Sequence, residues 1–190
     1  MKSRRRTGIL ALLAALALGP AAQDAAAVAM TWTVDPAHSQ LTFHPRLAGG
    51  EFAGRFERFD ATIRFDPADL AHSSLRVVVD LPGARTGDAD RDAALQDNDF
   101  FQTTRWPRGT FVSSGIKSLG NGRFEAAGRL SLRDVTRDVR VQFRFDPAAP
   151  SGGSARMTGS SNLRRLEFGV GQGEWRSTEW LDDAVRVEFD

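Results

Sequence analysis

The sequence contains no cysteine among its 190 residues. Disulfide bonds, thiol catalysis and cysteine-ligated metal centres are therefore excluded, and packing alone must hold the fold together. Histidine is scarce as well, and the three histidines, His38, His44 and His72, form no His-x-His or His-x-x-x-His pair, which disfavours a metal site. A Gly-x-Ser-x-Gly motif is also missing, which argues against an α/β-hydrolase nucleophile.

Long apolar runs are missing beyond the amino-terminal stretch. There, Lys2 and the arginines at 4–6 precede an apolar run from Gly8 to Gly19, followed by the A-x-A sequence Ala27-Val28-Ala29. The run is too short to span a bilayer, and its flanks are those of a secretory signal peptide. We therefore expect a cleavable signal over residues 1–29 and a periplasmic location, with the export route left open between the general and the twin-arginine systems.

A strongly basic surface is missing once the signal is set aside. Residues 1–29 hold four of the 25 basic residues and one of the 24 acidic ones, so residues 30–190 carry 21 basic against 23 acidic residues and a net charge of −2. This balance predicts no nucleic-acid partner, because such proteins carry a clustered basic face. The length predicts one domain over residues 30–190, large enough to bury its own core.

Apolar and polar residues alternate along most of the chain. The clearest case is the stretch 139–145, in which valines and phenylalanines alternate with Arg140, Gln142 and Arg144. Asn121-Gly122 lies between two such stretches and predicts a type I′ hairpin turn. The spacing predicts about eight antiparallel strands, and an up-and-down barrel is favoured over a sandwich because closure removes exposed edges. A barrel of this size either fills itself with side chains or holds one slender ligand.

The stretch from Thr86 to Phe101 is the one segment with helical character. Five aspartates lie in it and it ends on adjacent phenylalanines. The acids at 88, 90, 92 and 99 match part of a calcium-binding EF-hand loop, but Ala93 stands where that loop needs glycine. We favour N-capping, in which Asp88 or Asp90 accepts hydrogen bonds from the free amides of the first turn.

Several weak motifs occur in a consistent order. They are Trp32-x-Val34-Asp35-x-x-x-His38-Ser39-x-Leu41-x-Phe43, Gly54-Arg55-Phe56 with Phe59, Thr86-Gly87, Arg91-Asp92, Asp99-Phe100-Phe101, Pro107, Phe111, Ser113, Leu130-x-Leu132, Val135-Thr136 and Arg165-x-x-Phe168-Gly169. Together they resemble the YceI-like family of periplasmic polyisoprenoid-binding proteins. The chain departs from that family at Leu47, where a second histidine is common, and at Asp134, where glycine is usual.

This resemblance implies an all-β, eight-stranded antiparallel up-and-down, lipocalin-like barrel with one inserted short helix. It also implies a binding or carrier protein for an isoprenoid, quinone-like or polyprenyl, or for another long-chain amphiphile, without cofactor, metal or catalytic residue. From the alternation we expect the lumen and its mouth to be lined by thirteen residues: Phe43, Phe65, Val77, Val79, Leu95, Phe100, Phe101, Phe111, Leu130, Leu132, Val141, Phe143 and Phe168.

Two alternatives remain at this point. One is a hydrolase or isomerase that acts on an amphiphile and uses His38 with Asp35, although residues 38 and 39 point to opposite faces of an extended chain. The other is a filled barrel that acts through a membrane protein partner in a redox or stress pathway. A homodimer is compatible with either. Arg91 and Arg165 are further candidates, with structural pairing to Asp92 or Asp99 as the plainer role.

Overall fold

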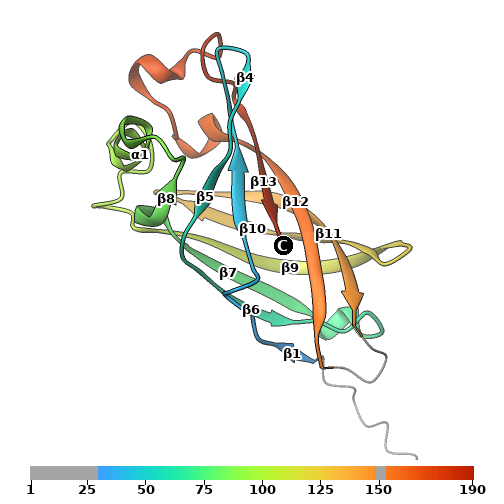
Figure 1. Cartoon of the computed structure of the whole chain (residues 1–190). Coiled ribbons are helices and arrows are strands. Elements are labelled where there is room, and N and C mark those ends of the chain that lie inside the picture. The colour runs from blue at the N-terminus through green and yellow to red at the C-terminus, as the bar shows by residue number, and fades with distance from the viewer. Residues whose placement is uncertain (1–29, 149–152) are drawn as a thin grey trace, which may run out of the picture.

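The computed structural model describes residues 30–148 and 153–190 (Figure 1). The predicted signal peptide, residues 1–29, lies outside this part of the chain. The strands are β1 (Thr31–Trp32), β2 (Leu41–His44), β3 (Arg46–Leu47), β4 (Gly50–Glu51), β5 (Gly54–Phe56), β6 (Phe59–Arg64), β7 (Ser74–Asp80), β8 (Ala84–Arg85), β9 (Arg108–Gly120), β10 (Arg123–Leu132), β11 (Val135–Pro147), β12 (Ala155–Arg164) and β13 (Ala184–Phe189). The helices are α1 (Ala89–Gln96) and the 3-10 turns η1 (Leu70–His72), η2 (Leu81–Gly83), η3 (Arg165–Phe168) and η4 (Gly173–Arg176).

The strands combine into eight longer antiparallel ones that follow each other in chain order around a barrel (Figure 1). β5 and β6 are one bent strand that pairs with the bent strand β7 and β8. Two hydrogen bonds join these two bent strands at their bends. The amide of Glu57 donates to the Gly83 carbonyl, and the amide of Asp80 donates to the Arg58 carbonyl, each at 3.0 Å. β1 and β2 pair with β6 and β5 respectively, and β13 pairs with β2. The predicted up-and-down barrel is confirmed.

The bend in the second long strand lies at Glu57-Arg58. Phe56 and Phe59 both face inward although three positions separate them, so one extra residue is inserted there as in a β-bulge. Gly54 is buried at the start of β5, where a side chain would overlap the Phe43 ring on the paired strand. Its role is close packing rather than bending.

Two tight turns connect the longest strands. Asn121 and Gly122 have φ values of 54° and 71° between the paired residues Gly120 and Arg123, which confirms the predicted type I′ turn. The next turn, Arg133-Asp134, also has two residues, but the positive φ of 57° belongs to Arg133. Positive φ at the first central residue alone is the pattern of a type II′ turn, so Asp134, where the family usually has glycine, does not take the left-handed conformation.

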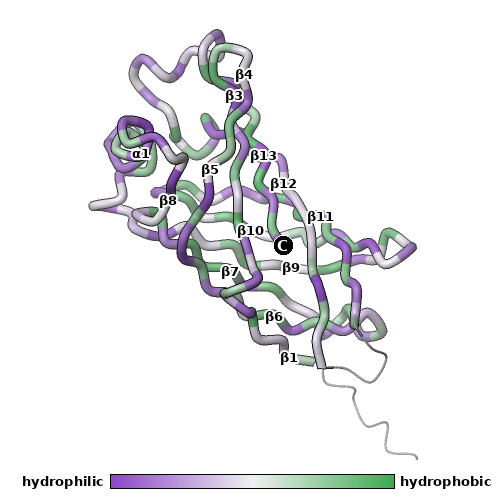
Figure 2. The backbone as a smooth tube through the Cα atoms, in the orientation of Figure 1, coloured by the Kyte–Doolittle hydropathy of each residue, from purple (hydrophilic) through white to green (hydrophobic). Residues whose placement is uncertain are grey.

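The interior holds two apolar clusters. The first, towards the end of the barrel that carries β1, contains Phe65, Phe111, Phe124, Phe143 and Phe145 among its members. The second, beside α1, contains Phe43, Leu81, Phe101 and Phe168. Apolar and polar residues alternate along the strands, as the colours of Figure 2 show. Packing of these faces replaces the disulfide bonds that the chain lacks.

Candidate functional site

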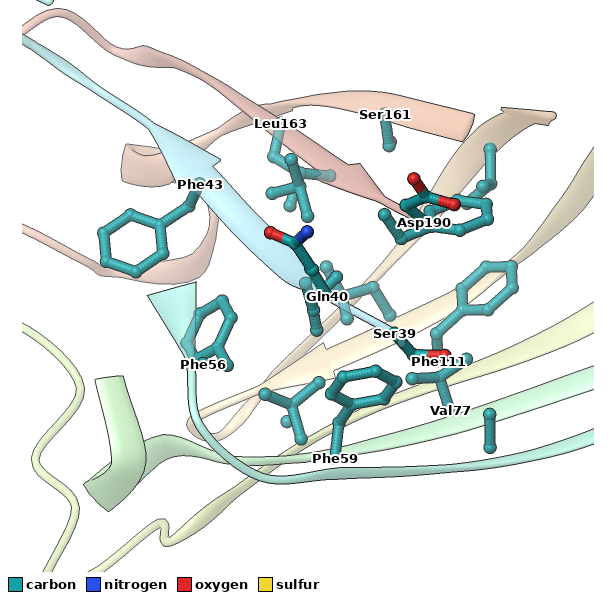
Figure 3. Close-up of a pocket in the computed structure, with 18 of the residues that line it drawn as sticks. Ser39, Gln40, Phe43, Phe56, Phe59, Val77, Phe111, Ser161, Leu163 and Asp190 are labelled. Atoms are coloured by element: carbon teal, nitrogen blue, oxygen red, sulfur yellow. The ribbon is translucent and has the colours of Figure 1, made fainter. Parts of the chain in front are cut away.

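A cavity of about 1190 Å³ runs through the barrel between and beyond the two clusters. It is larger than the roughly 300–1,000 Å³ of ordinary small-molecule pockets. Its wall comes mainly from inward residues of the strands, and Figure 3 shows Phe43, Phe56 and Phe59 with Leu163 and Phe111 around the space. A barrel that is hollow rather than filled provides room for one long, slender molecule.

The structure brings eleven of the thirteen predicted lining residues to this cavity. They are Phe43, Val77, Val79, Leu95, Phe100, Phe101, Phe111, Leu130, Leu132, Val141 and Phe168. Phe65 and Phe143 are the corrections. Both point inward but are 0% and 3% exposed, and their rings pack edge to face at 5.3 Å within the first cluster, so they support the wall without reaching its surface.

Other wall residues escaped the sequence analysis. They are inward residues of the second and the last two long strands and include Phe56, Phe59, Ile63, Leu163, Val185 and Val187. The period of two was present at 59, 61 and 63 and again at 185, 187 and 189. The bulge at Glu57-Arg58 obscured the first set. Residues at even positions face inward before the bulge, and residues at odd positions face inward after it.

The segment around α1 lines one end of the cavity. The helix begins at the cap residue Asp88, whose carboxylate accepts from the Arg91 amide at 3.0 Å, so the capping prediction is confirmed. Asp92 accepts from the amide and the hydroxyl of Thr86 at 2.6 and 2.7 Å. Desolvation is the largest single effect and raises the pKa of Asp92, but these hydrogen bonds and the charges of Arg85 and Arg91 together lower the pKa below its ordinary value. The acids of this segment therefore shape the helix start.

The phenylalanines after α1 seat the segment on the barrel. Phe101 is buried, with its ring centroid 6.3 Å from that of Phe56, and Phe100 lies 5.7 Å from Trp175. Just before them, the Asp99 carbonyl accepts from the amides of Gly171 and Gln172. These contacts join the helical insert to the segment after η3.

Two arginines hold this end together. The side chain of Arg133 donates to the carbonyls of Phe100 and Gly169 and lies 5.0 Å from the Trp106 ring. Arg165 is 5% exposed and donates to four backbone carbonyls, those of Val170, Gly171, Leu181 and Asp182, at 2.6–3.1 Å.

The expected pairing with a carboxylate at a helix or strand end is wrong for Arg165, whereas Arg91 does pair with a helix-end carboxylate, that of Asp88. Arg165 is hydrogen-bonded to carbonyls instead of Asp92 or Asp99, and its burial lowers the pKa of the guanidinium. Arg91 lies 3.7 Å from Asp88 and 4.8 Å from the Phe52 ring centroid. The Arg91–Asp88 pair is a local i, i+3 contact at the helix start, whereas the Phe52 ring at Arg91 and the carbonyls of residues 181 and 182 at Arg165 come from segments that meet only in the folded barrel.

The other end of the cavity opens between β1 and the start of β12. β13 pairs with β12 only from Gly159 onwards, and β1 pairs with β6. The described residues of β1 therefore form no β-ladder with those of β12 up to Thr158. Asp35, His38, Ser39 and Gln40 rim this opening. Figure 3 shows Ser39 and Gln40 beside Asp190 in front of the apolar wall.

His38 is a turn residue here. Its Nδ1 lies 2.8 Å from the Asp35 carboxylate, and the imidazole is 83% exposed. Hydrogen bonding to His38 is the main cause of the lowered pKa of Asp35. Within residues 30–148 and 153–190, no group of three or more histidine and carboxylate side chains could hold a metal ion, and no helix is long and apolar enough to cross a membrane.

Comparison with known proteins gives a consistent result. The YceI-like domain family matches residues 32–190. A UPF0312 protein of Vibrio parahaemolyticus is 31% identical over 193 aligned positions, which cover 98% of this chain and 97% of that protein. A UPF0312 protein of Pseudomonas savastanoi is 33% identical, with 93% and 95% covered.

Solved structures show the same architecture. The crystal structure of BcnA from Burkholderia cenocepacia matches with a TM-score of 0.77 at 29% identity, covering 82% of this chain and 96% of that one. The Campylobacter jejuni YceI protein matches with a TM-score of 0.61 at 26% identity, covering 71% and 80%. A polyisoprenoid-binding domain from Saccharophagus degradans matches with a TM-score of 0.59, covering 80% and 90%, and at 15% identity it supports the fold alone.

Proposed function

The chain belongs to the YceI-like family, and from this premise we propose that it is an exported carrier that holds an isoprenoid or another long-chain amphiphilic lipid in its barrel. The observation that carries the proposal is the continuous cavity of about 1190 Å³ with an apolar wall. A filled barrel would need a protein partner to act, whereas a hollow apolar one binds by burying the ligand itself.

The wall chemistry suits a hydrocarbon chain. Each CH₂ group transferred from water to such a wall contributes about 0.8 kcal/mol, so a long tail binds well with few polar contacts. Aromatic residues such as Phe43, Phe56 and Phe111 supply much of that surface. The polyisoprenoid ligand named for the Saccharophagus degradans domain, which shares this fold, is a chain of this type.

The proposal includes binding without covalent chemistry. His38, the histidine of the enzyme alternative, is paired to Asp35 on the solvent side of a turn. The amphiphile's polar group would then lie at one of the two rims, at the α1 end or at the opening beside β1, while its tail follows the apolar wall. Export to the periplasm rests on the signal-like composition of residues 1–29.

Native mass spectrometry and organic extraction test the proposal. Protein purified gently from the periplasm of its own host should release a prenyl or long-chain acyl lipid, at up to one molecule per chain. The matched control is a His72→Ala variant, which should retain that lipid because His72 does not line the cavity. Repeated recovery of lipid-free protein would contradict the carrier, and turnover of an amphiphile that His38→Ala abolishes would favour the enzyme.

A further inference from the structure

We propose that the α1 end of the barrel docks on a bilayer through an exposed pair of tryptophans. This surface, which we name the tryptophan rim, consists of Trp175, Trp180 and the hairpin tip Ala48-Gly49. The inference rests on the proposed function, since a carrier of water-insoluble chains must meet the membrane that supplies or receives them.

The exposure of the two tryptophans is the first observation. Trp180 is 64% exposed and Trp175 37% exposed, and both lie in one short segment that contains η4. Tryptophan combines a large apolar ring with a polar N–H group, which is why it gathers at membrane interfaces. Two such exposed rings in one short segment therefore indicate an interaction surface.

The rim is continuous with the cavity. Trp175 is part of the cavity wall and contacts Phe100, so one edge of the rim belongs to the cavity wall itself. The Trp180 carbonyl accepts from the Ala48 amide at 2.7 Å, and the next residue, Leu181, bridges to Leu47. Both leucines line the cavity. A chain leaving a membrane beneath the rim would enter the barrel without crossing water.

The rim is placed to reach a flat surface. The β3–β4 hairpin and the segment that contains η4 project together at the end of the barrel beyond α1 (Figure 1). The hairpin tip consists of Ala48 and Gly49, both exposed and both with positive φ, so small residues and not bulky polar side chains form the point beside Trp180.

Charge specifies the kind of bilayer. The two segments that carry the rim, residues 45–52 and 173–182, contain two basic and four acidic residues, a net charge of −2: Arg46, Arg176, Glu51, Glu174, Glu179 and Asp182. An anionic lipid surface would repel this rim. The rim therefore fits a zwitterionic surface, with binding driven by insertion of the rings.

A second copy of the chain fits the rim less well. Two tryptophans can bury at most about 500 Å². A stable dimer needs about 800 Å² from each partner, and the surroundings of the rim carry repelling acids. A bilayer needs no complementary partner surface, only access for the rings.

Sedimentation with phosphatidylcholine vesicles tests the proposal. The purified protein should bind them, and Trp180→Ser should bind about tenfold more weakly, because the ring's apolar surface is lost. Trp180 is exposed and lies outside the cavity wall, so this variant should fold normally. The matched control is Leu119→Ser, which removes another exposed apolar side chain, 39% exposed, on the β9–β10 hairpin and should bind like the wild type.

A second experiment varies the charge of the vesicles. Replacing part of the phosphatidylcholine by phosphatidylglycerol should weaken binding at low salt, and added salt should restore it. Equal binding of Trp180→Ser and wild type, or stronger binding to phosphatidylglycerol, would overturn the proposal. Wild-type protein that binds none of these vesicles would also overturn the proposal and would favour a protein partner for the rim.

Uptake of a fluorescent prenyl alcohol in solution separates this proposal from the carrier function. Trp180→Ser should take up the probe as the wild type does, since its cavity is intact. Uptake by wild type without vesicle binding would overturn the docking and leave the carrier function standing. Vesicle binding without uptake would instead contradict the carrier function on which the docking rests.

Discussion

Arg165 shows how one side chain can organise an irregular part of the barrel. Its guanidinium donates to carbonyls of two segments, residues 170–171 and 181–182. No β-ladder of the described residues pairs these two segments with each other. Arg165→Ala would leave these buried acceptors unpaired, at a cost of about 3 kcal/mol or more. Arg165→Lys should recover only part of the loss, because an ammonium group cannot reproduce the planar arrangement of donors. Urea unfolding measures both variants.

The exposed Arg137 provides the control for that measurement. Its side chain makes a hydrogen bond to the adjacent Thr136 carbonyl. Arg137→Ala should change the free energy of unfolding by no more than about 0.5 kcal/mol. If the alanine variants at 165 and 137 cost the same, the bonds of Arg165 are not what holds its two segments.

Glu125 makes stability depend on pH. Hydrogen bonds from Lys117 and Gln142, opposed by desolvation and aided by the charges of Lys117 and Arg140, lower its pKa below the ordinary 4.5. A lowered carboxylate pKa adds stability above pH 4.5 that is lost as the pH falls through the folded-state value. Wild type should therefore lose more stability than Glu125→Gln between pH 6 and pH 3 in urea titrations. An equal loss in both proteins would exclude this contribution.

At the scale of elements, the segment around α1 separates a structural role from a ligand-related one. Asp88→Ala removes the helix cap and should cost about 1 kcal/mol. Asp90→Ala should cost less, because the exposed Asp90 acts only through the helix dipole. Amide exchange across α1 and urea unfolding measure the difference, and an equal effect at the two positions would contradict the assignment of Asp88 as the cap.

The same segment lines one end of the cavity, and that role belongs to its phenylalanines. Replacing Phe100 and Phe101 by serine should weaken lipid retention more than replacing Asp88 and Asp90 by asparagine, since the rings line the cavity. Lipid content per protein, measured by mass spectrometry, decides the order. The reverse order would contradict this assignment and favour the aspartates Asp88 and Asp90 as a binding site.

At the scale of the molecule, the free space in the barrel is the property that function depends on. Ala61 points into the cavity from β6, whereas its neighbour Thr62 is exposed on the outer face. Ala61→Trp should fill part of the lumen and reduce uptake of a prenyl probe at least several-fold. Thr62→Trp should leave uptake unchanged. Circular dichroism checks that both variants fold, and equal uptake would show that the lumen does not hold the chain.

The local parts of the fold could be predicted because short-range rules specify them. The period of two identified most strands. The residue types themselves identified the turn at Asn121-Gly122 and the helix cap at Asp88. Contacts across the barrel could not be predicted in the same way. The pairing of Arg133 with Phe100 and Gly169 joins residues 33 and 36 positions apart, and alternation along a strand carries no information about such distances.

The division between sequence and structure is clearest in the inward-facing residues. Alternation by itself determined that Phe65, Phe111 and Phe143 share the inner face, because side chains in a strand point alternately to its two sides. Tertiary structure alone decided that Phe111 reaches the lumen while Phe65 and Phe143 pack behind its surface. Whether a barrel is hollow depends on its curvature and on how rings from different strands fill the space, and both arise only when the sheet curls around itself.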